Sequence, residues 1–115
     1  MLRAPPFRTA EINGFLRLLG ICLQAAEFPR VRFTSWWRDR AENARVGGHP
    51  NSQHLTGLAV DVAQRGATEG VEAFIAACEA VGLVVIDEGD HWHIQRYAAS
   101  AARGLCCGAA VSVAG

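Results

Sequence analysis

Two short polar segments, far apart in the sequence, constrain this chain more than any other feature. The first runs from Ser52 to Asp61 and includes His54, and the second runs from Asp90 to His93. Two imidazoles and one carboxylate, as in His54, Asp61 and His93, form the ligand set of a catalytic zinc site that keeps its fourth position open. We therefore expect a fold that brings these three side chains together, with the carboxylate of Asp90 left over beside them.

The length and composition describe an ordinary folded domain. The chain has 115 residues, of which 50% are hydrophobic and 19% charged, and this balance argues against disorder. Eleven basic residues match eleven acidic ones, so the basic excess of a nucleic-acid-binding protein is missing. We expect one domain over residues 1–115, a monomer, and no nucleic-acid partner.

The cysteines do not indicate a zinc-thiolate site. Cys22 and Cys78 fall on apolar helical faces and are predicted to be buried core residues, whereas Cys106 and Cys107 are adjacent near the end of the chain. No C-x-x-C pair is present, and nothing indicates a secreted disulfide framework, so synthesis in a reducing cytosol is the better interpretation.

The two ends of the chain indicate neither a leader nor an anchor. Residues 1–8 carry charge and contain no apolar run that ends at a small-residue cleavage site, so we expect no signal peptide. The apolar stretch over residues 104–115 is shorter than the ~20 residues that span a bilayer. We expect residues 98–115 to form a short helix or a loose tail, and we expect no membrane anchor.

Apolar periodicity predicts the secondary structure. Spacings of three and four predict two main helices over Thr9–Glu27, with Thr9 as N-cap, and Thr68–Val81. A polar segment, Arg38–Val46, is predicted as a short exposed helix that ends at Gly47. The order of elements suggests an α+β domain with a small, mainly antiparallel sheet. The predicted strands are Val31–Ser35, Ala59–Ala63, a buried strand over Leu83–Ile86, and its hairpin partner His91–Gln95.

Asp61 is the most informative single residue. It lies inside an apolar strand, where burying a carboxylate is costly unless it is paired or coordinates a metal. A solvent-facing position or an ion pair with an arginine is an equally common fate for such a residue. A lone His54 is similarly ambiguous, but Gly57 between the two permits a sharp turn that would bring both side chains together.

The second segment offers several chemical roles. Asp90 enters the strand from a turn and from there could act as general base on a metal-bound water, with Glu88 as a rival for this role. His91 and His93 point to one face of the strand and Trp92 to the other, where we expect it to pack in the core. His91 is a candidate for lining the cleft or bonding a ligand, or else a surface histidine.

The two segments resemble the zinc D-alanyl-D-alanine metallopeptidase family. That family includes D-Ala-D-Ala carboxypeptidases and dipeptidases, and phage endolysins that cut L-Ala–D-Glu bonds in peptidoglycan; hedgehog signalling proteins are its fold relatives. The resemblance extends from about Phe33 to Ile94 and includes the segment Asn43–Gly48. The pattern that carries it is Ser52-x-His54-x-x-Gly57-x-Ala59-x-Asp61 followed by Asp90-x-Trp92-His93.

The resemblance implies the roles of the site residues. It implies one zinc ion held by His54, Asp61 and His93, a zinc-bound water as nucleophile, and Asp90 as the acid/base carboxylate. Ser52 would contact substrate or hold the ligand loop, although a simple turn serine is nearly as good an interpretation, and His91 would line the substrate cleft.

A third segment resembles the family's Ser-Gly-Tyr-Arg sequence. It runs from Thr34 to Arg38 and places Arg38 where an arginine steadies the substrate carbonyl and its developing oxyanion. Trp36 and Trp37 replace the usual small residue and tyrosine, so Arg40 is a rival for this role.

The function that the resemblance implies is hydrolysis of the peptidoglycan stem peptide. The bond is either L-Ala–D-Glu, as in an endopeptidase, or D-Ala–D-Ala, as in a carboxypeptidase. The lack of a leader fits synthesis in the cytoplasm and lysin-like release to the cell wall. The main alternative is a non-catalytic zinc-binding module of the same fold. A metal nuclease and a non-haem iron oxygenase fit less well, because a basic charge and an H-x-D spacing are missing.

Overall fold

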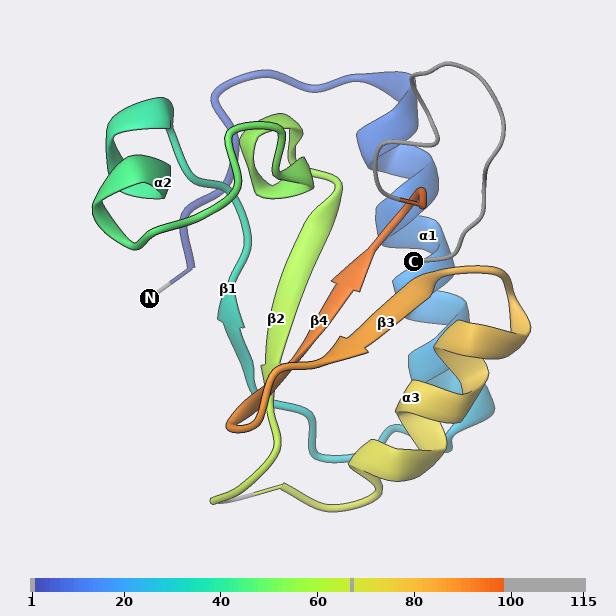
Figure 1. The fold of residues 1–115 in the computed structure, drawn as a ribbon. Helices are drawn as coiled ribbons and strands as arrows, with labels where there is room; N and C mark the ends of the chain where they lie inside the picture. The colour runs from blue at the N-terminus through green and yellow to red at the C-terminus, as the bar shows by residue number, and fades with distance from the viewer. Residues whose placement is uncertain (1, 67, 99–115) are drawn as a thin grey trace.

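The computed structural model describes residues 2–66 and 68–98, which form one α+β unit (Figure 1). The sequence therefore predicts the fold class correctly. In chain order the elements are α1 (Ala10–Ala25), β1 (Phe33–Ser35), α2 (Arg40–Arg45), the 3₁₀ helix η1 (Gln53–Thr56), β2 (Ala59–Ala63), α3 (Val71–Ala80), β3 (Val84–Asp87) and β4 (His91–Gln95).

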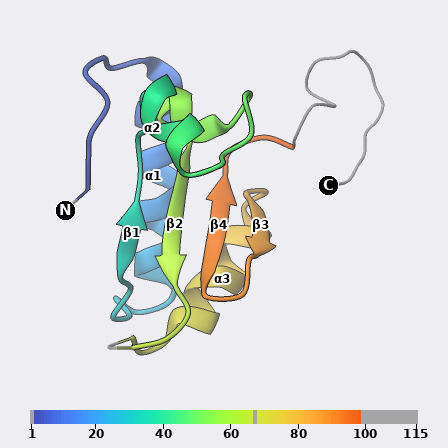
Figure 2. The ribbon, with the colours of Figure 1, turned by 60° about the vertical axis from the view of Figure 1, so that its left-hand side comes forward.

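The strands form one antiparallel sheet in the order β1-β2-β4-β3. Helices α1 and α3 cover one face of this sheet, whereas α2 and η1 gather at the end where β2 begins and β4 ends (Figure 2). Val60 and Val62 of β2 and Ile94 of β4 join the hydrophobic core beneath the helices. Because side chains alternate along a strand, Asp61 and His93 lie on the face opposite to α1 and α3.

The first helix has the predicted start and an earlier end. The Thr9 hydroxyl accepts a hydrogen bond from the Ile12 amide at 3.0 Å, which confirms the N-cap. The helix ends at Ala25, two residues before the predicted end, because Glu27 and Phe28 adopt left-handed backbone conformations with φ of 63° and 55°.

Two other predicted elements begin too early. Helix α3 begins at Val71 and not at Thr68, because Glu69 forms an isolated antiparallel bridge with Arg30 that keeps this segment extended. Strand β1 begins at Phe33, two residues after its predicted start. The rings of Phe33 and Phe74 of α3 pack edge to face with 6.0 Å between their centroids, and this contact ties the strand to the core.

Helix α2 shows how local polar residues set its limits. Asp39 caps it, accepting a hydrogen bond from the Glu42 amide at 2.8 Å, so the helix begins at Arg40 and not at Arg38. Gly47, with φ of 75°, follows the helix in the left-handed conformation that the sequence predicts.

The prediction that Leu83–Ile86 forms a buried strand is wrong. The strand runs over Val84–Asp87 and lies at the edge of the sheet, so its valines are only partly buried and Ile86 is 37% exposed. The hairpin with β4 is as predicted, and Gly89 supplies its turn with φ of 94°.

Cys22 and Cys78 are buried free thiols between α1 and α3, as predicted. Burial raises the pKa of both thiols, so they are protonated at neutral pH. Cys106, Cys107 and the tail over residues 98–115 fall, apart from residue 98, outside the described residues. No helix in the described part of the chain is long and apolar enough to cross a membrane.

Candidate metal centre

The register of the central strand pair brings two of the three predicted ligands together. Asp61 of β2 is the direct partner of His93 on β4. Opposed side chains in an antiparallel pair face each other closely, and Nδ1 of His93 lies 3.2 Å from Oδ1 of Asp61. The side chain of Asp61 is 7% exposed and that of His93 is 12% exposed, so this pair lies in a largely water-excluded setting.

The third residue, His54, comes from η1. The hydroxyl of Ser52 accepts a hydrogen bond from the His54 amide at 3.1 Å and so caps this 3₁₀ turn. Gly57 then reverses the chain with φ of 79°, which leads directly into β2. The turn places Nε2 of His54 3.2 Å from Oδ1 of Asp61, and the His54 side chain is 1% exposed.

The outward-facing nitrogen of each histidine has its own hydrogen-bond acceptor. Nδ1 of His54 bonds the backbone carbonyl of Trp36, and Nε2 of His93 lies 2.7 Å from Oε1 of Gln95. When such a ring is neutral, an acceptor at the outer nitrogen favours a proton there and a lone pair on the inner nitrogen that faces Asp61. Metal-binding histidines are characteristically held in this way.

The three side chains fit a zinc ion. One donor atom from each of His54, Asp61 and His93 lies within 4.8 Å of the others. Tetrahedral zinc, with bonds of about 2.0–2.2 Å to nitrogen and oxygen, separates neighbouring donors by about 3.3–3.5 Å. The observed 3.2 Å from the Asp61 oxygen to each imidazole is close to this spacing. The donor set of two imidazoles and one carboxylate, with both Asp61 spacings close to those of tetrahedral zinc, therefore suits this metal.

The electrostatics of the cluster favour a charged Asp61. Burial works against its ionisation, but hydrogen bonds from His54 and His93 outweigh burial and hold the pKa of Asp61 well below its usual range. Burial likewise lowers the pKa of His93, whereas its bonds to Asp61 and Gln95 raise it, and the net shift is upward. In the metal-free site, protons on the imidazoles therefore supply the positive charge next to Asp61 that a metal ion would otherwise supply.

Arg38, and not Arg40, lies beside the cluster. Its Nη2 forms an ion pair with Oδ2 of Asp61 at 3.1 Å, and its Nη1 lies 3.4 Å from Oδ1 of Asn43. Asn43 is 4% exposed and donates to the His49 carbonyl at 2.8 Å, so it supports the guanidinium from the α2 side. Arg40 is exposed at the first position of α2.

His91 links the cluster to two exposed carboxylates of the β3–β4 hairpin. Its Nε2 lies 2.8 Å from Oε1 of Glu88 and 3.9 Å from Oδ1 of Asp61, and its Nδ1 lies 2.6 Å from Oδ1 of Asp90. Burial lowers the pKa of His91, but these carboxylates raise it on balance. The bond to His91 lowers the pKa of Asp90, which is therefore ionised at neutral pH. Asp90 thus contacts His91, and His91 in turn lies next to Asp61 of the cluster.

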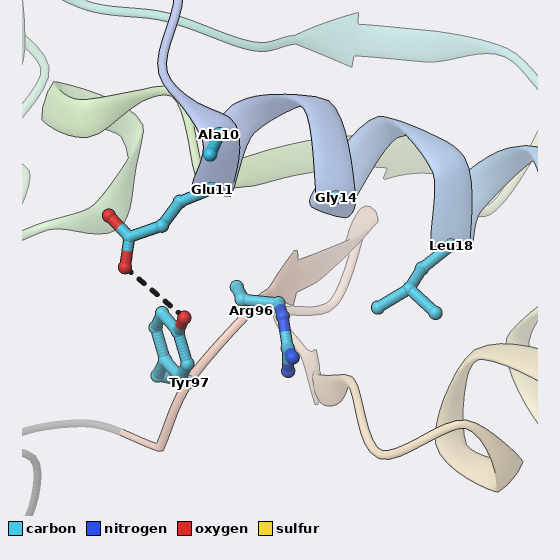
Figure 3. Close-up of a pocket in the computed structure, with 6 residues that line it drawn as sticks. All are labelled: Ala10, Glu11, Gly14, Leu18, Arg96 and Tyr97. Carbon is cyan, nitrogen blue, oxygen red and sulfur yellow. Dashed lines mark hydrogen bonds between the residues drawn. The ribbon is translucent and has the colours of Figure 1, made fainter.

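Among the described residues, one surface hollow lies next to His91 and another lies beside α1. The hollow next to His91 has a volume of about 390 Å³ and is lined by Arg32, Thr34, Ala63, Arg65, Asp90 and His91. The other, of about 420 Å³, lies between α1 and the segment after β4 (Figure 3). Its carboxylate, Glu11, accepts a hydrogen bond from the Tyr97 hydroxyl at 3.2 Å, and no predicted ligand lines it. The hollow next to His91 is the nearer of the two to the cluster, because Nε2 of His91 lies 3.9 Å from Oδ1 of Asp61.

Sequence reasoning assigned no role to two residues that support this centre. Gln95 stands two residues after His93, and the alternation of β4 alone places it on the same face of the sheet. Asn43 lies within the segment that carries the family resemblance, but its bond to Arg38 depends on how α2 folds back over η1. Trp92 packs against the core, as predicted.

Comparison with protein families identifies one match. The model of a family described as Peptidase M15 matches residues 7–101 of the chain, which includes all of the residues of the candidate centre. Comparisons with curated proteins and with solved structures find no match.

Proposed function

This chain belongs to the Peptidase M15 family, and on this premise we propose that it hydrolyses peptide bonds in the stem peptide of bacterial peptidoglycan. The family match covers residues 7–101 and confirms the family resemblance, so the chain is a zinc-dependent metallopeptidase.

The observation that carries the proposal is the arrangement of His54, Asp61 and His93 on the face of the sheet opposite to α1 and α3. We propose that these three residues hold one zinc ion. Such an ion supplies Lewis-acid polarisation of a peptide carbonyl and activation of a water molecule. The acceptors behind both imidazoles keep the two rings oriented, and Ser52 holds the turn that presents His54.

We propose that Arg38 steadies the negative charge that develops on the substrate carbonyl. Its guanidinium is held between Asp61 and Asn43, at the border of the cluster. A cation fixed in this way before the reaction stabilises developing charge without the cost of reorganisation. Because Arg40 makes no such contact among the described residues, Arg38 is the stronger candidate.

Asp90 is our candidate for the general base, on the basis of its position three residues before His93. Its carboxylate is ionised, exposed and bonded to His91, so it can accept a proton near the cluster and return it to the departing amine. Glu88 remains the rival, since it bonds the His91 nitrogen that faces Asp61.

The hollow next to His91 supports an acidic peptide as substrate. It opens on the face that carries the cluster, and Arg32 and Arg65 contribute positive charge to its wall. Stem peptides carry free carboxylates, which arginine binds well, whereas Asp90 on the same wall limits how closely a carboxylate can approach on that side. His91 would line the path between this hollow and the cluster.

Mass spectrometry of defined stem peptides tests the proposal. Zinc-loaded protein would be incubated with peptides that contain both an L-Ala–D-Glu and a D-Ala–D-Ala bond, with and without a chelator. Release of D-Ala would indicate a carboxypeptidase, and cleavage after L-Ala an endopeptidase; either activity must disappear with the chelator and return with zinc. No cleavage by a protein that retains zinc would instead favour the non-catalytic zinc-binding module.

A further inference from the structure

Gln95 is a buried polar side chain with a specific contact to the candidate centre. It is 6% exposed and lies two residues beyond His93 on the same face of β4. Its Oε1 lies 2.7 Å from Nε2 of His93, the nitrogen that faces away from Asp61.

The backbone of Tyr97 determines which way the Gln95 amide points. The Gln95 Nε2 donates to the Tyr97 carbonyl at 2.7 Å. A carbonyl only accepts, so the amide group must turn its NH₂ toward Tyr97 and its oxygen toward His93. An oxygen at this position accepts a hydrogen bond from a protonated Nε2 and repels an unprotonated one.

Tyr97 is itself held from two sides. Gln53 donates to the Tyr97 carbonyl at 2.7 Å and accepts from the Tyr97 amide at 3.0 Å, and Gln53 directly precedes His54 in η1. The Tyr97 hydroxyl donates to Glu11 on α1 (Figure 3). The Tyr97 carbonyl thus accepts two hydrogen bonds, one from Gln53 beside His54 and one from Gln95 on the strand of His93.

Asp61 and Gln95 compete for the single proton of the neutral His93 ring. Oδ1 of Asp61 lies 3.2 Å from Nδ1 of His93, and a carboxylate is the stronger acceptor. A neutral ring protonated on Nδ1 would bond Asp61 well but could not offer that nitrogen to a metal. Gln95 opposes this tautomer from the other side of the ring.

We propose that Gln95 is a positioning residue that, backed by the Tyr97 carbonyl, keeps the His93 proton on Nε2 and leaves Nδ1 free to bind zinc. This inference rests on the ligand assignment in the proposed function. It predicts that the Gln95 amide affects metal affinity although Gln95 is not one of the proposed ligands and contacts His93 only at Nε2. Partners behind metal-binding histidines commonly change affinity by about 10–100-fold.

The test compares Gln95→Leu, which removes the acceptor with little change in volume, with Gln95→Glu, which keeps an oxygen facing Nε2. Zinc affinity would be measured by chelator competition, and the tautomer of the metal-free His93 by long-range ¹H–¹⁵N NMR. The chain has only 4 histidines, so the ring signals can be assigned. Gln24→Leu, on the exposed side of α1, is the matched control.

We expect Gln95→Leu to weaken zinc binding by about 10–100-fold and to move the neutral His93 proton toward Nδ1, whereas Gln95→Glu keeps it on Nε2 and binds zinc more tightly than Gln95→Leu. Folded Gln95→Leu protein with wild-type affinity and tautomer overturns the inference. If Gln95→Leu does not fold, Gln53→Ala loosens the Tyr97 carbonyl instead, and an unchanged zinc affinity there overturns it equally.

These measurements separate the inference from the proposed function. Neither the affinity nor the tautomer requires turnover, so a protein that binds zinc in the predicted way but cleaves no stem peptide would leave the role of Gln95 intact. A wild-type protein that binds no zinc at His93 overturns the ligand assignment and the inference together.

Discussion

Two neighbouring regions on the same face of the sheet have opposite properties. In the cluster of His54, Asp61 and His93, the side chains are 1–12% exposed and each ring nitrogen has a partner. In the β3–β4 hairpin, Asp90 is 82% exposed and Glu88 44% exposed, and both bond His91 at the border between the regions.

The difference separates two chemical requirements. A metal site needs ligands of fixed orientation, which regular strands and a capped turn provide. Proton transfer instead needs a group that reaches both the reacting atoms and solvent, which an exposed turn provides. Metal binding and proton transfer should therefore respond separately to mutation.

The largest expected effect is the loss of a ligand. In His54→Ala the remaining ligands cannot complete the site, and zinc content should fall to background together with all zinc-dependent turnover. Metal analysis after gel filtration measures this directly. His49→Ala, in the exposed loop before η1, should retain full zinc content. Normal zinc in His54→Ala would refute the ligand assignment.

A change in the hairpin should leave zinc in place and remove turnover. Asp90→Asn keeps the size of the side chain but removes the base, so we expect kcat/KM to fall about 10²–10⁴-fold with unchanged zinc content. Glu88→Gln should cost less than about tenfold. If Glu88→Gln shows the greater loss, the base is Glu88 and the assignment from the sequence is wrong.

Arg38 contacts the ligand Asp61 but is not itself a proposed ligand, so its loss should affect turnover more than zinc binding. Arg38→Gln should retain zinc and slow turnover about 10²-fold, as loss of one oxyanion-stabilising group does. Arg40→Gln, with its side chain exposed on α2, should behave as wild type. A steady-state comparison of the two variants decides between them, and equal rates would exclude Arg38 from catalysis.

The smallest expected effect is on stability as pH changes. The pKa of His93 and that of His91 are raised above their ordinary 6.5 in the folded protein. Both histidines therefore contribute to the free energy of unfolding. This contribution is complete below pH 6.5 and is lost as the pH rises through the raised pKa values of the folded state. Metal-free protein should thus lose stability as the pH rises above about 6.5. Zinc should remove the part of this pH dependence that comes from His93, because binding of the metal displaces a proton from that ring. The free energy of unfolding of both forms would be measured at several pH values, and the same dependence on pH in both would contradict this expectation.

Local patterns were sufficient for much of the fold. The helices, the β3–β4 hairpin and the position of Asp61 inside an apolar strand follow from periodicities of 3.6 and 2, which neighbouring residues set. The two sequence segments also indicated the cluster, because each places its candidate ligands on a short element. Errors occurred where a distant partner intervened, as at Glu69, which pairs with Arg30 and delays α3.

The sequence by itself determined which residue types are available for a metal site, and the spacing that places His91, His93 and Gln95 on one strand face. Only the tertiary structure decided that Asp61 pairs with His93, that Arg38 reaches the cluster, and that Gln95 is oriented by Tyr97. It also made β3 an edge strand and so left Ile86 exposed. The physical reason is range: periodicity arises from contacts a few residues apart, whereas register and edge position depend on strand pairing between residues far apart in the chain.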